Sequence, residues 1–236
     1  MQALQIHRTL SRGKWYANLS APLQSALAEQ GQVRQLPPGQ RLFSRGDCAD
    51  GIYAVLSGCV QIVGTSRSGV DDKSVILTLI EPPDWFGEIC LFDRQPRTHD
   101  AIADEPATLL HVRQHTLDTL FAQHPHYWRE FGLLLTQKIR LMFGAIEDAA
   151  LLPTPIRLIR RLVQMTEGYG IRCEQSGILG SRTVNVSQEK LSSILAISRQ
   201  TVNQILKELE NENLIGIRRG SLEILDLQTL KQKAQL

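Results

Sequence analysis

Apolar and polar residues follow three successive patterns along the chain, and each pattern predicts a different structure. Residues 20–30 have apolar positions at helical spacing, with Ser20 as the expected N-cap. From there to about Leu117, short apolar and β-branched runs are separated by Gly, Pro and Asp. Many short strands with closely spaced turn signals predict a β-sandwich or jelly-roll barrel. The expected strands cover residues 52–56, 60–63, 75–80, 102–103 and 108–112.

Beyond Pro125 the pattern becomes that of one long helix, expected from about His126 to Ala150. Apolar residues recur at intervals of four and three, which is the seam spacing of a coiled coil. Other apolar residues lie off this seam, so the helix has more than one face to bury. We expect one face to pack on the barrel and the seam to pack on a second copy of the chain. A helix buried entirely within its own chain is the alternative. The seam residues are Leu135, Ile139, Met142, Ile146 and Ala149.

Pro153 and Pro155 mark the strongest predicted boundary in the chain. Each proline lacks a backbone N–H and disfavours helical geometry in the residue before it. The long helix is therefore expected to end near residue 150, and a shorter helix is expected over residues 156–167.

Residues 187–210 have the pattern of two helices joined by a three-residue turn. Ser187 and Ser198 are each expected to cap a helix by accepting a hydrogen bond from a free backbone N–H. In the second helix, four apolar residues at i, i+3, i+4 and i+7 form one buried stripe. The opposite face is rich in hydrogen-bond donors, which suits the major groove of a polyanionic duplex. A helical hairpin with a merely solvated polar face is the alternative.

A β-hairpin with two arginines at its tip is predicted over residues 214–225. A hairpin in this place is the wing of a winged helix, and its basic tip can reach backbone phosphates. The candidate DNA-binding residues are Ser187, Ser198, Arg199, Gln200, Asn203, Gln204, Lys207, Arg218 and Arg219.

The charge distribution agrees with this division of the chain. The formal net charge of the 236 residues is only +2. Residues 1–150 carry 14 Lys and Arg against 16 Asp and Glu, a net −2, whereas residues 151–236 carry 12 against 8, a net +4. A basic C-terminal part is what a DNA-binding module requires.

Two stretches, Phe86–Thr98 and Ile197–Glu210, are the most specific parts of a similarity that covers about residues 20–227. On these stretches the chain resembles the cyclic-AMP receptor protein and fumarate–nitrate regulator (Crp/Fnr) family of bacterial transcription factors. The resemblance implies an α+β fold in three parts. These are a β-roll (jelly-roll) sensor domain of the cyclic-nucleotide-binding type at 1–125, a dimerisation helix at 126–150 and a winged helix-turn-helix DNA-binding domain at 151–236.

The resemblance also implies an effector pocket in the β-roll. In relatives that bind cyclic nucleotides, a Gly-Glu pair meets the ribose 2′-hydroxyl and an Arg followed by Ser or Thr holds the cyclic phosphate. A carboxylate suits a hydroxyl donor, and a guanidinium with a neighbouring hydroxyl suits a phosphate monoanion. The long-helix positions that face adenine in these relatives fall on Met142 and Phe143, and neither side chain can hydrogen-bond an exocyclic amine. The candidate effector-binding residues are Gly87, Glu88, Arg97, Thr98, Met142 and Phe143.

A cyclic nucleotide such as cyclic AMP, a different ligand and an empty pocket all stay open. In the last case Glu88 and Arg97 would only pair with each other. His99 follows the Arg-Thr pair, where relatives have a small residue, and its role also stays open.

Other cofactors of the family are not expected. No cysteine precedes Cys48, so the N-terminal cysteine cluster of the oxygen-sensing branch is absent and no iron–sulfur cluster is predicted. Neither haem nor a metal is expected, because the histidines lack ligand spacing. The four cysteines, predicted to be buried or partly buried free thiols, are Cys48, Cys59, Cys90 and Cys173, and the histidines available as haem ligands by composition only are His111, His115, His124 and His126.

Two departures from the family pattern lie in the helix pair. Ala196 stands where most relatives have Gly, at a position that commonly needs a left-handed backbone, so we expect either a slightly strained turn or a different turn geometry. The reading positions carry Arg199, Gln200 and Gln204, where the cyclic-AMP branch has Arg, Glu and Arg. Because Arg favours guanine and Gln favours adenine, we expect a half-site that keeps guanine under Arg199 and differs under Gln204.

The function predicted from all of this is a homodimeric, sequence-specific transcription regulator with an effector-controlled β-roll. Its expected partners are a palindromic double-stranded DNA site, a second copy of itself and RNA polymerase. A constitutive dimeric regulator whose roll is structural or contacts polymerase is the alternative, and an enzyme of the cupin type is disfavoured. No stretch of about 20 apolar residues is present, and the N-terminus lacks a secretion signal. We therefore predict a cytoplasmic protein with no membrane partner.

Overall fold

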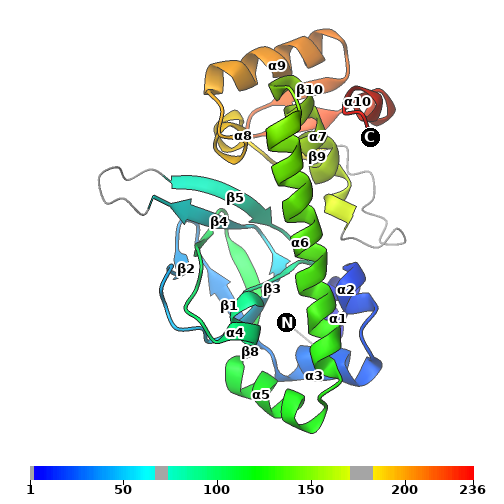
Figure 1. Ribbon diagram of the computed structural model, residues 1–236. Helices are drawn as coiled ribbons and strands as arrows, with labels where there is room; N and C mark the ends of the chain where they lie inside the picture. The colour runs from blue at the N-terminus through cyan, green and yellow to red at the C-terminus, as the bar shows by residue number, and fades with distance from the viewer. Residues whose placement is uncertain (1–2, 67–73, 171–182) are drawn as a thin grey trace. The chain divides into compact units, whose positions relative to one another are not determined.

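A computed structural model describes residues 3–66, 74–170 and 183–236 of the chain. The chain forms two compact units, Met1–Ile139 and Arg140–Leu236. Figure 1 shows the helices and strands of both units.

The first unit is a roll of two four-stranded antiparallel sheets. The strand orders are β1-β8-β3-β6 and β2-β7-β4-β5. Three of these strands, β1, β2 and β6, are absent from the sequence prediction, because their runs are short or mostly polar. The strands are β1 (Gln32–Leu36), β2 (Arg41–Phe43), β3 (Gly51–Ser57), β4 (Val60–Thr65), β5 (Ser74–Ile80), β6 (Trp85–Phe86), β7 (Asp100–Ala103) and β8 (Ala107–Arg113).

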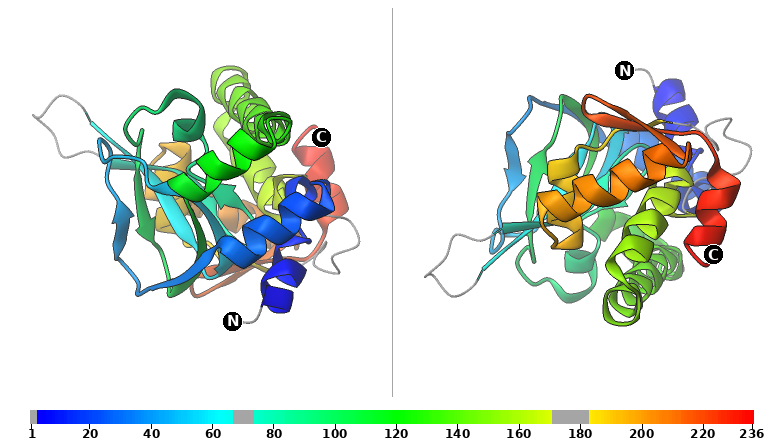
Figure 2. Two further views of the ribbon diagram at one scale, coloured as in Figure 1. Left: turned by 90° about the horizontal axis from the view of Figure 1, so that it is seen from below. Right: turned by 90° about the horizontal axis from the view of Figure 1, so that it is seen from above.

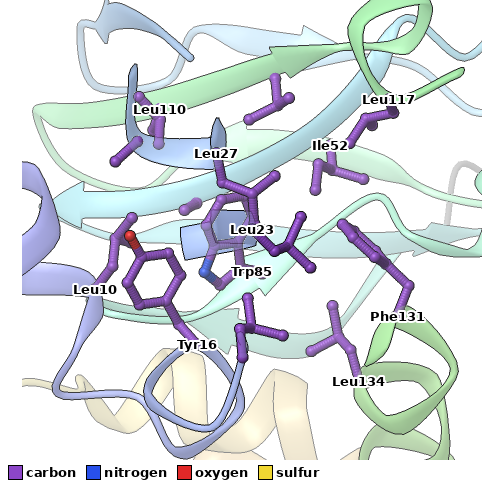
Figure 3. Close-up of a cluster of buried hydrophobic side chains, with 14 of the residues drawn as sticks. Leu10, Tyr16, Leu23, Leu27, Ile52, Trp85, Leu110, Leu117, Phe131 and Leu134 are labelled. Atoms are coloured by element: carbon purple, nitrogen blue, oxygen red, sulfur yellow. The ribbon is translucent and has the colours of Figure 1, made fainter. Parts of the chain in front are cut away.

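Strand β3 is buried along its length, and its two faces belong to different cores. Successive side chains of a strand point to opposite faces. Ile52 and Ala54 pack in a cluster with the helices, whereas Tyr53 and Val55 pack in a second cluster with residues of the other sheet. Because both faces are covered, the strand is apolar without the alternation of a half-exposed strand. Figure 3 shows part of the helix-side cluster, where Ile52 lies among side chains from several helices.

Helices of the first unit cover the outer face of the β1-β8-β3-β6 sheet. Helices α3 and α5 both pack on β8, and the view from below shows them at the same end of the roll (Figure 2). Helix α6 corresponds to the predicted long helix, and its bounds lie within one residue of those expected at each end. The helices are α1 (Ala3–Leu10), α2 (Lys14–Ala17), α3 (Ala21–Gln30), α4 (Ile89–Asp93), α5 (Gln114–Gln123) and α6 (Tyr127–Leu151).

Ser20 begins α3 as predicted, but the expected hydroxyl cap is wrong. The Ser20 side chain makes no capping hydrogen bond. Its hydroxyl instead donates to Glu130 Oε1 at 3.1 Å, while its backbone N–H donates to Glu130 Oε2 at 3.0 Å. The Ser20 hydroxyl is therefore oriented by the Glu130 carboxylate of α6, a strong charged acceptor, and makes no hydrogen bond to the first turn of α3.

In its described residues, the second unit contains the C-terminal half of α6 and a small sheet with four further α-helices. The sheet order is β10-β11-β9, and β10 and β11 form the predicted hairpin. Figure 2, in the view from above, shows α9 with this hairpin beside it. The elements are α7 (Thr154–Thr166), the 3₁₀ turn η1 (Gly168–Gly170), β9 (Thr183–Val184), α8 (Gln188–Leu195), α9 (Arg199–Asn211), β10 (Ile215–Arg218), β11 (Ser221–Ile224) and α10 (Leu227–Lys233).

Pro153 lies at the corner between α6 and α7, and Pro155 is in the first turn of α7. Arg160 of α7 makes hydrogen bonds to the end of α6 and to the residues after α10. The Arg160 Nη1 donates to Asp148 Oδ1 of α6 at 2.6 Å. Its Nε and Nη2 donate to the carbonyl oxygen of Ala234, at 3.1 Å and 2.9 Å. Arg160 thus joins three segments of the second unit: α6, α7 and the residues that follow α10.

Helix α8 ends at Ala196, whose backbone is left-handed with φ 52° and ψ 44°. Of the two alternatives for this position, the structure has the left-handed backbone and not a different turn geometry. A residue with a Cβ pays about 1–2 kcal/mol for this conformation, so the turn carries backbone strain that Gly would remove.

We expect Ala196→Gly to raise the free energy of unfolding of the second unit by about 1 kcal/mol, because Gly adopts φ > 0 without the steric cost. Denaturant unfolding followed by circular dichroism measures the change. The matched control is Ala145→Gly at an exposed position within α6, where the same substitution should destabilise by about 1 kcal/mol. A loss of stability in both variants would contradict the strain at Ala196.

Candidate functional site

Helices α8 and α9 begin on the two serines predicted to cap them. Ser187 Oγ accepts a hydrogen bond from the backbone N–H of Lys190 at 3.2 Å. Ser198 Oγ accepts one from the backbone N–H of Thr201 at 3.0 Å. Both hydroxyls thus serve to fix the helix starts, and the start of α9 is held next to the turn at Ala196.

The predicted buried stripe of α9 is confirmed, since Val202, Ile205, Leu206 and Leu209 are all at most 5% exposed. The other face of the helix is polar. Asn203 is half-buried, while the remaining predicted contact residues of α9 are exposed, namely Arg199, Gln200, Gln204 and Lys207. The helix therefore presents long hydrogen-bonding side chains from its first two turns, where base edges are usually met.

Carboxylates stand next to two of these side chains. Glu189 of α8 places Oε2 3.8 Å from Arg199 Nη2. Gln204 Nε2 donates to Glu208 Oε1 at 3.1 Å. Neither neighbour is among the predicted site residues; the i, i+4 spacing of Gln204 and Glu208 was the signal for the second.

Arg157 is a further residue that the sequence analysis left without a role. Its Nη2 donates to the carbonyl oxygen of Leu195 at 3.0 Å. That carbonyl lies at the end of α8, immediately before the left-handed Ala196. Arg157 therefore links α7 to the turn that precedes α9.

The wing is the two-stranded hairpin β10–β11, in which Arg218 pairs with Ser221 across the tip. Arg219 and Gly220 form the tip, where the positive φ of Gly220 (80°) allows the tight turn. Arg218 Nη2 lies 3.2 Å from Glu223 Oε2, and both side chains are exposed. No ion pair is seen for Arg219 within the described ranges, so its guanidinium is the more available of the two.

The first unit gathers a second group of predicted residues around Arg97, which is 3% exposed. Its Nη2 donates to Asp50 Oδ1 at 2.8 Å and to the Gly51 carbonyl at 2.7 Å, while Nη1 donates to the Gly87 carbonyl at 3.0 Å. The guanidinium carbon lies 4.3 Å from the centre of the Phe43 ring, a cation–π distance. Arg97 is thus rigidly held by its own unit.

Gly87 is required by this packing. Its φ is +90°, and a Cβ there would lie 2.7 Å from Arg97 Nη1. Any side chain at this position would therefore meet the guanidinium.

Glu88 does not pair with Arg97. Its carboxylate Oε2 instead accepts from Lys138 Nζ of α6 at 2.7 Å, and Lys138 also donates to the Trp85 carbonyl at 2.6 Å. The alternative in which Glu88 and Arg97 only pair with each other is therefore wrong. A lysine on the long helix supplies the counter-charge for the buried Glu88.

Thr98 is exposed beside Arg97, and His99 Nδ1 lies 3.0 Å from its hydroxyl oxygen. The Thr98 carbonyl accepts from Arg45 Nε at 2.7 Å. Met142 and Phe143 belong to the second unit, and each is 60% exposed. The first unit therefore assembles four of the six predicted effector residues, Gly87, Glu88, Arg97 and Thr98.

One buried donor near these residues is left over. Arg97 Nε is fully buried and has no nitrogen or oxygen acceptor among the described residues, while the Arg97 guanidinium also makes a hydrogen bond with the Cys90 thiol, a weak acceptor. An unpaired buried N–H is costly, and an anionic oxygen is the acceptor that suits a guanidinium best. The group of Arg97, Thr98 and Glu88 thus has the chemistry to hold an anion and a hydroxyl.

Asp50 is a residue of this group that sequence reasoning missed. It accepts from Tyr53 as well as from Arg97, and these hydrogen bonds hold the pKa of its carboxyl below the usual value against the opposing effect of burial. Burial disfavours the charged form of His111 and lowers its pKa. The His111 and Tyr53 rings stack with their centroids 4.3 Å apart. His111 is thus a packed strand residue, as predicted.

The cysteine prediction is partly wrong, because Cys48 is exposed whereas Cys59 and Cys90 are buried free thiols. Cys173 lies outside the described residues. Across residues 3–66, 74–170 and 183–236, no three His, Cys, Asp or Glu side chains are grouped as a metal site requires. No helix in those ranges has the length and apolar character to cross a membrane.

Comparison with known proteins matches both units to described families. Residues 33–124 match the cyclic nucleotide-binding domain model, and residues 156–233 match the Crp-like helix-turn-helix domain model. The chain is 26% identical over 226 residues to the CRP-like cAMP-activated global transcriptional regulator of Mycobacterium tuberculosis, which covers 96% of this chain and 98% of that protein.

Solved structures share the fold. FixK2 from Bradyrhizobium japonicum matches 86% of this chain and 96% of its own with a TM-score of 0.73 at 15% identity. The c-di-GMP responsive global regulator CLP from Xanthomonas campestris matches 87% of this chain and 99% of its own with a TM-score of 0.67 at 20% identity.

The wing tip gives a test with a built-in control. We expect Arg219→Ala to weaken binding to any duplex sequence and to reduce the slope of log affinity against log salt by about one per wing, because one phosphate contact is lost. Arg218→Ala should change the slope less, since Arg218 already has Glu223 as a partner. Fluorescence anisotropy over a salt series measures both slopes, and a larger effect of Arg218→Ala would refute the assignment.

Proposed function

The chain belongs to the Crp/Fnr family of DNA-binding transcription regulators, and we propose that it works as a homodimer whose DNA affinity is set by a small anionic effector in the β-roll. Its relatives are regulators, and the chain is accordingly not an enzyme. The observation that carries the regulatory part of the proposal is the grouping of Gly87, Glu88, Arg97 and Thr98 in the first unit, with the Arg97 guanidinium next to the exposed Thr98.

The dimer is supported by the apolar seam of α6. Within the single chain, the predicted seam residues Ile139, Met142 and Ile146 are 38%, 60% and 57% exposed. Phe143 and Leu151 are exposed on the same helix. A contiguous exposed apolar stripe of this kind marks an interaction site, and heptad-like spacing fits a second identical helix.

A two-fold dimer would present two copies of α9 and two wings. Each α9 would enter a major groove with Arg199, Gln200 and Gln204 toward the bases, while the wing tips meet phosphates. Two-fold symmetry then calls for a palindromic site with half-sites about one helical turn apart. RNA polymerase is the partner expected of a regulator bound in this way.

The effector proposed for the roll is a cyclic nucleotide. Arg97 Nε and the Thr98 hydroxyl would hold its phosphate, and the Glu88 carboxylate would accept from a sugar hydroxyl. A bound phosphate would be a stronger acceptor for the guanidinium than the Cys90 thiol. One relative is described as cAMP-activated and another as c-di-GMP responsive. We therefore propose a cyclic nucleotide as the class of effector and do not assign its base.

Regulation requires a difference in affinity between states. The effector must bind the DNA-competent dimer more tightly than the other form, or it shifts nothing. Lys138 of α6 holds Glu88, so a ligand that competes for Glu88 acts directly on the long helix. This contact is the route by which the roll would influence the dimer.

A specific observation also favours a second function, that of a constitutive regulator with a structural roll. Arg97 is already satisfied at Nη1 and Nη2 by Gly87, Asp50 and Gly51 of its own unit. A phosphate would therefore meet a guanidinium with only part of its hydrogen-bonding capacity free.

We expect Ile146→Glu to convert the dimer to monomer and to lower affinity for a palindromic site about 100-fold or more, because the second half-site no longer binds intramolecularly. Sedimentation measures the mass and anisotropy the affinity. Thr136→Glu, at an exposed position off the seam, should leave the dimer intact. A monomeric wild type, or a dimeric Ile146→Glu protein, would contradict the assigned interface.

Calorimetry with a panel of cyclic mononucleotides and cyclic dinucleotides tests the effector. We expect saturable heat with at least one of them and about ten-fold weaker binding in Thr98→Val, which loses one hydrogen bond to a charged group. Thr119→Val, on the exposed side of α5, is the control. No heat with any nucleotide, together with DNA affinity unchanged by them, would favour the constitutive regulator.

A further inference from the structure

Gln204 and Glu208 lie one turn apart on α9, and both side chains are exposed. The Gln204 Nε2 donates to Glu208 Oε1 at 3.1 Å. Glu208 is on the flank of the helix, between its groove-facing side and the buried stripe. This pair involves a side chain at a base-reading position and a neighbour that no motif singles out.

The contact fixes which end of the Gln204 amide points away from Glu208. An ionised carboxylate can only accept hydrogen bonds. The amide must therefore turn its NH₂ group to Glu208, since its carbonyl oxygen would be repelled. One N–H is taken by Glu208, and the carbonyl oxygen with the second N–H remains for a ligand.

These two remaining groups match one base in particular. Adenine presents the N6 amine, a donor, beside N7, an acceptor, and an amide oxygen with one N–H pairs with both. Guanine presents two acceptors, O6 and N7. With one N–H committed to Glu208, only one N–H can donate to guanine, and the amide oxygen would then face the second guanine acceptor and be repelled. To donate both N–H groups to guanine, the amide would have to turn and give up its bond to Glu208.

We propose that Glu208 is a specificity-determining positioning residue that orients the Gln204 amide to select adenine against guanine at one base pair of each half-site. The proposal rests on the proposed function, in that α9 enters the major groove. Glu208 itself contacts no base. It acts by making one orientation of Gln204 electrostatically unfavourable.

Glu212 provides a matched control near the end of the same helix. It is an exposed carboxylate at the C-cap of α9, and it pairs with Lys233 Nζ at 2.8 Å instead of with a reading residue. Removing either carboxylate makes the second unit more positive by one charge, so both changes should raise DNA affinity uniformly over sequence. Only the loss of Glu208 frees the Gln204 amide to turn.

The experiment is binding of the full-length chain to a library of randomised palindromic half-sites, for wild type, Gln204→Ala, Glu208→Ala and Glu212→Ala. Gln204→Ala identifies the base pair that Gln204 meets. At that pair, wild type should prefer adenine over guanine by about five-fold or more, the usual discrimination of a bidentate contact. Glu208→Ala should reduce the preference about two-fold, the size expected of an exposed i, i+4 pair, while Glu212→Ala should keep it.

Different outcomes overturn different statements. If wild type shows no sequence preference at any position, sequence-specific binding itself fails. If preferences exist but Glu208→Ala retains that of wild type at the Gln204 base pair, or Glu212→Ala relaxes it equally, the positioning role of Glu208 is refuted. A wild-type preference for guanine at that pair refutes it as well. Circular dichroism of the variants checks that α9 is intact.

Discussion

The burial of both faces of strand β3 is the constraint on which the first unit depends. A strand with no solvent face needs a second sheet on one side and helices on the other. Gly51 begins this strand, and a Cβ there would lie 2.1 Å from the Val112 carbonyl, so the backbones of β3 and β8 approach closely. The same point in the chain offers the Gly51 carbonyl and the Asp50 carboxylate to Arg97. The packing that builds the roll therefore also fixes the guanidinium.

In the second unit, several contacts hold the exposed polar helix α9 in place. Serine caps fix where α8 and α9 begin, Arg157 holds the end of α8, and the apolar stripe of α9 is buried. The wing is tied to α9 as well, because Glu210 Oε1 accepts from the backbone N–H of Ile217 at 3.0 Å. These contacts hold the exposed basic side chains of α9 and the wing in place, which suits a polyanion of regular shape.

The helix pair, the long helix and the hairpin could be predicted because local signals agree there: caps, a 3.6-residue period and a Gly at the tip. Strands β1, β2 and β6 could not, because β1 is mostly polar and exposed and β6 has only two residues. Helices α1 and α2 depend on contacts distant in sequence, such as the hydrogen bond from Trp15 Nε1 to the Glu130 carbonyl at 2.7 Å. The partners of the site residues were hidden for the same reason. Asp50 and Lys138 are 47 and 50 residues from Arg97 and Glu88, and no local pattern connects residues so far apart.

The Arg160 contacts give the proline corner a mechanical property. A bend made of two prolines alone would let α7 swivel on the end of α6. Here Arg160 donates hydrogen bonds both to Asp148 on α6 and to the Ala234 carbonyl near the end of the chain. On the same helix, Arg157 donates to the Leu195 carbonyl at the end of α8. The angle between α6 and α7 is therefore held by hydrogen bonds of Arg160 and not by the prolines alone, so one side chain helps to fix the direction of α7 relative to the end of α6.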